Sequence, residues 1–121
     1  MFIEFNANPR KKCVGDCTVR AISKIIGKSW EDTFIDLCIF ALCDYDMPTA
    51  NSVWAKYLHS QGYKKYPIDR DITVEEFCEE NPNGRYILGT GTHAIAVENG
   101  DFFDVWDSGN EIPIYYFQKE C

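Results

Sequence analysis

The stretch GDCTVRAISKII, residues 15–26, decides the expected fold because it describes one helix with a sharp start and a broad apolar face. Apolar residues stand at positions 19, 21, 22, 25 and 26, which is the spacing of one side of a helix. Gly27 follows directly, and glycine suits the left-handed conformation in which many helices end. We therefore expect a helix over Cys17–Ile26 that is buried on most sides.

Further helices are expected on the C-terminal side of this stretch. Ser29 has the properties of an N-cap, and apolar residues at helical spacing then predict a second helix to about Cys43. A third helix is expected over about 50–61, where a glycine follows. Thr73 and Glu76 have the spacing of a capping box, which predicts one more, short helix.

The pattern changes to β-strands in the second half of the chain. Segments 93–97 and 102–106 alternate around Glu98-Asn-Gly-Asp101, which is a clear hairpin signal. Further short strands are expected at 2–5, 63–68, 85–88 and 114–117. Helices followed by an antiparallel sheet indicate an α+β fold, and the length indicates one domain over 1–121.

Charge and composition exclude several classes of function. The net charge of −7 repels phosphate backbones, so we expect no nucleic-acid partner. No apolar run approaches the ~18 residues of a membrane span, so no membrane partner is expected either. The first residues lack the apolar core of a secretory signal, which favours a cytoplasmic protein.

The six cysteines are expected to be free thiols, as in other proteins of reducing compartments. Structural zinc sites favour close Cys pairs such as C-x2-C with a second pair downstream. Here the close pairs are Cys13-x3-Cys17 and Cys38-x4-Cys43, and the chain has only two histidines. We therefore expect no metal and no structural disulfide. A regulatory disulfide between Cys13 and Cys17 is the alternative.

Cys17 and His93 form the candidate catalytic pair. A helix N-terminus lowers the pKa of a thiol, and a nearby imidazole forms an ion pair with the thiolate. Cys17 opens a helix, and His93 opens a strand, with Asp104 and Asp107 on the return strand as candidates to orient the imidazole. The competing interpretation is packing alone, because cysteine is among the most buried residue types.

Three segments carry a resemblance to a known superfamily. Residues 15–26 resemble the catalytic helix of papain-like cysteine peptidases, and the Asp-Cys pair is closest to the peptidase domains that process bacteriocin leader peptides. THAIAV at 92–97 resembles the His strand of that superfamily, and VWDSG at 105–109 resembles its Asn/Asp element. The chain is also similar to small proteins of bacterial and phage genomes.

The resemblance implies a papain-like fold, in which N-terminal helices, one of them the buried catalytic helix, pack on a C-terminal antiparallel sheet. It implies thiol-dependent hydrolysis of an amide or ester in a peptide or protein substrate, without a cofactor. Cys17 would attack the carbonyl and His93 would take and return the proton. Acyl transfer by the same residues is a further option.

One departure from the family pattern concerns the oxyanion. Such enzymes commonly carry a Gln six residues before the nucleophile, where this chain has Lys11. Loss of one oxyanion donor typically costs a factor of ~10²–10³ in rate. Asn8 is the candidate replacement, although an Asn before Pro9 is equally consistent with turn chemistry. A binding or inhibitory module that kept the fold without efficient turnover is therefore the alternative function.

The choice between Asp107 and Asp104 depends on the register of the hairpin. A three-residue turn at 98–100 makes His93 and Asp107 diagonal neighbours, whereas a two-residue turn places His93 opposite Trp106 with Asp104 on its side. We prefer the first register because it leaves one face of the hairpin apolar and matches the placement that the resemblance implies. Asp107 is therefore the expected third residue, with Asp104 as the alternative.

Overall fold

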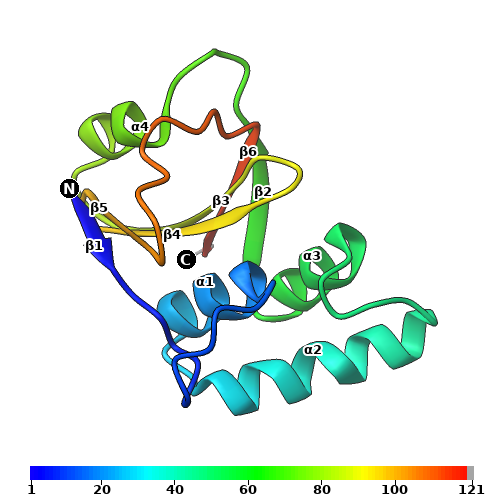
Figure 1. Ribbon diagram of the computed structural model, residues 1–121. Coiled ribbons are helices and arrows are strands. Elements are labelled where there is room, and N and C mark those ends of the chain that lie inside the picture. Colours follow the sequence, from blue (N-terminus) through cyan, green and yellow to red (C-terminus); the bar gives the residue numbers. More distant parts are fainter. Residues whose placement is uncertain (120–121) are drawn as a thin grey trace.

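The computed structural model describes residues 1–119, so the expectation of a free thiol at Cys121 lies outside the described residues. Residues 1–119 form four helices and six strands (Figure 1). Within them, no helix has the length and apolar character required to cross a membrane. In chain order the elements are β1 (Phe2–Glu4), α1 (Cys17–Ile26), α2 (Trp30–Asp44), α3 (Asn51–Ser60), β2 (Tyr63–Pro67), α4 (Val74–Glu80), β3 (Arg85–Gly89), β4 (Ala94–Glu98), β5 (Asp101–Asp104) and β6 (Tyr115–Lys119).

The helix ends follow from local capping. Gly27 adopts φ 83° at the end of α1, so the expected bounds of this helix are confirmed at both ends. The hydroxyl of Ser29 accepts a hydrogen bond from the Asp32 N–H at 3.1 Å at the start of α2. Thr73 and Glu76 form the expected reciprocal capping box at the start of α4.

The six strands form one mixed sheet in the order β1-β5-β4-β3-β6-β2. β1 lies parallel to β5 with Phe2 beside Phe102, whereas the other pairs are antiparallel. The α+β class is confirmed, but the expectation of a purely antiparallel, C-terminal sheet is wrong. Almost the whole chain separates β1 from β5, so no turn signal in the sequence could indicate their pairing.

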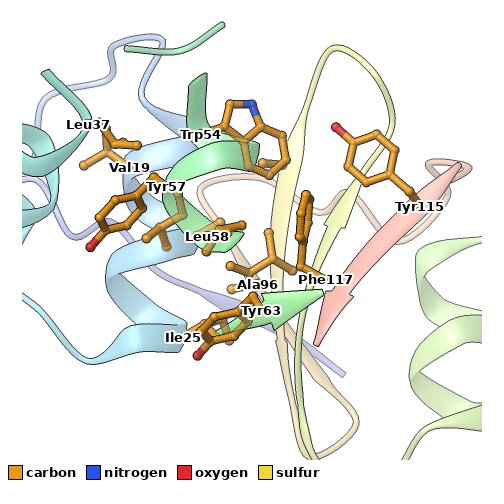
Figure 2. Close-up of a cluster of buried hydrophobic side chains, with 14 residues drawn as sticks. Val19, Ile25, Leu37, Trp54, Tyr57, Leu58, Tyr63, Ala96, Tyr115 and Phe117 are labelled. Carbon is orange, nitrogen blue, oxygen red and sulfur yellow. The ribbon is translucent and has the colours of Figure 1, made fainter. Parts of the chain in front are cut away.

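Both faces of the sheet are covered. α1 and α3 pack on one face, and their side chains meet Ala96 and Phe117 in the cluster shown in Figure 2. α4 packs on the other face, where Phe77 joins Leu88 and Phe102 in a second buried cluster. α2 lies outside α1 and α3, away from the sheet (Figure 1). Strands β3, β4 and β5 therefore carry apolar residues on both faces.

The hairpin between β4 and β5 has a two-residue turn. Glu98 pairs with Asp101, and the turn residues Asn99 and Gly100 have φ values of 50° and 81°. Positive φ at both positions is the signature of a type I′ turn, whose twist matches that of the strands. The preferred three-residue turn is therefore wrong. Its supporting argument, a single apolar face, fails because helices cover both faces of the sheet.

Candidate active site

Cys17 is the first residue of α1 and lies half-buried at the N-terminus of that helix. Its Sγ atom lies 3.9 Å from the hydroxyl oxygen of Thr18, and it has a hydrogen-bond interaction with the backbone of Ala94. Unpaired N–H groups and the positive end of the helix dipole meet here. The position therefore favours a negatively charged sulfur.

The imidazole of His93 lies between Cys17 and Asp104. Its Nε2 atom lies 2.6 Å from Oδ2 of Asp104, and the ring also hydrogen-bonds Cys17. Because Asp104 occupies Nε2, Nδ1 is the nitrogen left for the thiol. The backbone N–H of His93 donates to the Thr90 hydroxyl at 3.1 Å, which fixes the chain just before β4.

The register of the hairpin decides which aspartate reaches His93. The observed two-residue turn brings the rings of His93 and Trp106 to 5.2 Å between centroids, and places Asp104 on the side of His93. Asp107, the expected partner, instead accepts a hydrogen bond from the Gly109 N–H at 3.0 Å. The assignment of Asp107 as the partner of His93 is wrong because it depended on the other register.

Asp104 is 2% exposed and accepts four hydrogen bonds. Oδ1 accepts from Arg20 Nη2 at 3.1 Å and from the Val105 N–H at 2.8 Å. Oδ2 contacts His93 and accepts from the Ser108 hydroxyl at 2.8 Å. Such a saturated carboxylate cannot rotate without losing partners.

Electrostatics favour a thiolate and an imidazolium. Burial would raise the pKa of Cys17, but hydrogen bonds from His93 and Ala94 and the charge of His93 outweigh it, so the pKa is lowered. Burial would lower the pKa of His93, yet its hydrogen bonds to Asp104 and Cys17 raise the pKa to about 9. The pKa of Asp104 is lowered despite burial, chiefly by its hydrogen bonds to His93 and Ser108.

A cavity of about 400 Å³ opens beside Cys17 and His93. Its other walls include Thr18, Thr49 and Trp54, and none of its described lining residues is Lys, Arg, Asp or Glu. The side chain of Asn51 donates to the Gly91 carbonyl at 3.0 Å and so ties the start of α3 to the loop before His93. Apart from Cys17 and His93, the described walls of the cavity next to the sulfur therefore carry no charged side chain.

The structure does not bring Asn8 or Lys11 to this cavity. Asn8 is buried, and its side-chain oxygen accepts the Arg10 N–H at 2.9 Å, which is the turn role expected as the alternative. The Nζ atom of Lys11 donates to the backbone oxygen of Asn6 at 2.8 Å. The backbone N–H of Cys17 lies at the helix start, where N–H groups have no partner within the helix.

Comparison with protein-family models, with curated proteins and with solved structures finds no match to this chain. Within residues 1–119, no group of three or more His, Cys, Asp or Glu side chains lies close enough together to hold a metal ion.

Sequence reasoning missed Arg20 and Asp16, which are also joined to the site. Arg20 pairs with Asp16 through Nη1, and the Trp30 indole N–H donates to the other oxygen of Asp16 at 2.8 Å. A signal was present in the sequence, because Arg20 stands between Val19 and Ala21, which belong to the apolar positions of a helix expected to be buried on most sides. A buried arginine requires acidic partners.

Proposed function

We propose that this chain is a papain-like cysteine hydrolase that cleaves an amide bond in a peptide or protein. Cys17 is the nucleophile, His93 is the general acid and base, and Asp104 orients His93. The row of hydrogen bonds from Cys17 through His93 to Asp104 carries this proposal. A nucleophile at a helix start, a base at a strand start and an acid on the next strand match the order that the papain-like resemblance implies.

The proposed reaction begins with attack of the Cys17 thiolate on the carbonyl carbon. The resulting oxyanion accepts a hydrogen bond from the Cys17 backbone N–H. His93 gives its Nδ1 proton to the leaving nitrogen, the C–N bond breaks, and a thioester remains on Cys17. Water then attacks the thioester as His93 takes its proton, which releases a carboxylic acid and restores the thiolate–imidazolium pair.

Asp104 supports both steps in this proposal. Its hydrogen bond at Nε2 keeps Nδ1 of His93 directed at the sulfur. Its negative charge stabilises the imidazolium in the buried site. The five described cysteines are free, which fits a reducing compartment, and we propose that the protein acts in the cytoplasm.

A peptide library of defined sequences tests the proposal, with new termini read by mass spectrometry. We expect wild type to cut a subset of peptides, and expect Cys17→Ala and His93→Gln to lose those cuts while remaining folded by circular dichroism. Cys13→Ala removes an exposed thiol four residues away and is the matched control. Cleavage that persists in Cys17→Ala would contradict the proposal.

The second candidate function is a binding or inhibitory module with the same fold. It is favoured by Lys11, because this side chain stands where the family commonly has the Gln and does not line the cavity. Wild-type protein that alkylates rapidly at Cys17 but cuts no peptide supports this candidate. Transfer of the thioester acyl group to an added amine, in place of water, supports acyl transfer instead.

A further inference from the structure

Arg20 is a charged side chain buried inside the helix that begins at Cys17. It is 6% exposed and stands three residues after Cys17, one turn further along α1. A guanidinium in such a position is strongly unfavourable unless acidic groups surround it. Its Nη1 pairs with Asp16 and its Nη2 lies 3.1 Å from Oδ1 of Asp104.

These two contacts join parts of the chain that are far apart in sequence. Asp16 precedes α1, whereas Asp104 ends β5, 84 residues after Arg20. Arg20 therefore connects the helix that carries Cys17 to the strand end that supports His93. The Val105 N–H shares Oδ1 of Asp104 with Arg20, so Oδ2 is the oxygen that faces His93.

We propose that Arg20 is a positioning residue, which holds the carboxylate of Asp104 in the orientation that directs His93 at Cys17. This inference rests on the proposed function, since it assigns Arg20 a role through Asp104. Arg20 does not line the cavity, so it acts through its neighbours and not on a substrate.

Asp16 and Trp30 complete the arrangement. Asp16 is 4% exposed, and its two oxygens accept from Arg20 and from the Trp30 indole N–H. Trp30 begins α2, so α1, α2 and the end of β5 meet at the buried charges of Arg20, Asp16 and Asp104. The two terminal NH2 groups of an arginine lie in one fixed plane and can bind two partners at once, whereas a lysine offers a single point charge. The geometry therefore predicts that lysine replaces Arg20 only in part.

The test measures how fast iodoacetamide modifies Cys17 between pH 6 and pH 10, by mass spectrometry. At pH 6 the rate depends on His93 holding the sulfur as a thiolate, whereas at pH 10 most thiols are ionised without help. We expect Arg20→Gln to lower the rate at pH 6 by about tenfold and to leave the rate at pH 10 within about twofold. Arg20→Lys should recover part of the loss.

Thr33→Val is the matched control for lost stability. Thr33 is fully buried in α2, and its hydroxyl donates to the Ser29 carbonyl at 2.8 Å, a hydrogen bond that involves neither Asp104 nor His93. Loss of this buried hydrogen bond destabilises the fold, and we expect it to leave the pH profile of Cys17 unchanged. A shift equal to that of Arg20→Gln would show a purely structural role and overturn the proposal.

Two further outcomes separate this inference from the proposed function. A folded Arg20→Gln protein with the wild-type profile overturns the role of Arg20 alone. A wild-type protein whose Cys17 reacts no faster than an ordinary thiol at pH 6 overturns both proposals.

Asp16→Asn is the variant to use if Arg20→Gln does not fold. It keeps Arg20 but weakens the ion pair that orients the guanidinium. We expect that variant to shift the profile in the same sense, and an unchanged profile overturns the inference.

Discussion

His93 and Asp104 are joined by a hydrogen bond of 2.6 Å between Nε2 and Oδ2, which links the residue before β4 to the last residue of β5. Asp104 is nearly fully buried and His93 is largely buried, so little water competes for this contact. Short hydrogen bonds between charged groups are stronger than neutral ones, and low polarity strengthens them further. This contact, together with the hydrogen bond to Cys17, raises the pKa of His93 to about 9.

Asp104→Asn should therefore lower the rate of peptide cleavage strongly, whereas Asp107→Asn should not. The amide cannot supply the negative charge that stabilises imidazolium, and we expect peptide cleavage to fall by up to ~10⁴, as in the serine protease case. Asp107 contacts the backbone of Gly109, and its change should leave the rate within about twofold. The measurement is kcat/KM for the two variants. A larger loss of kcat/KM in Asp107→Asn would contradict the assignment of Asp104 as the residue that supports His93.

Cys17 should react first among the described cysteines at pH 6. Its pKa is lowered chiefly by His93, whereas burial raises the pKa of Cys78 to about 11. Brief alkylation followed by peptide mapping measures the order of labelling. The exposed Cys13 controls for simple accessibility. If Cys78 in the folded protein were labelled as fast as Cys17, the assignment of Cys17 as the reactive thiol would be contradicted.

The stabilising effect of His93 should decrease as the pH rises. Its pKa in the folded protein is about 9, above the ordinary value of ~6.5, so the folded state holds the proton more tightly. The contribution is therefore fully present below ~pH 6.5 and is lost as the pH rises to about 9. Urea unfolding of wild type and His93→Gln across this range measures it. A difference in unfolding free energy that grows with pH would contradict the sign.

Gly89→Ala should destabilise the protein strongly because the end of β3 has no room for a side chain. An added Cβ would lie 2.2 Å from the ring of Tyr115, which itself packs against Trp54 and Phe117. Overpacking of this kind costs about 1–3 kcal/mol. Gly15→Ala is the matched control, since no atom lies within 4 Å of its added Cβ. Equal urea midpoints for the two variants would contradict the predicted clash.

The sequence predicted the local elements because their causes lie within a few residues. The helical spacing of 15–26 with Gly27 defined α1, and the Thr73–Glu76 pair defined the start of α4. Cys17 and His93 were also identified as a pair from their places at the start of a helix and a strand. These signals need no knowledge of what the element packs against.

The sequence by itself determined the α+β class, the first helix and the pairing of Cys17 with His93, since short-range spacing and capping set these features. Only the tertiary structure decided that Asp104 supports His93 and that Arg20 reaches Asp104. Side chains alternate with a period of two along a strand, so one residue of register exchanges the two faces. Here helices cover both faces, and hydrophobicity could not choose between the registers. The register is instead fixed by the two-residue turn, whose residues have positive φ values. The contact between Arg20 and Asp104, which are 84 residues apart in the sequence, is compatible with this register.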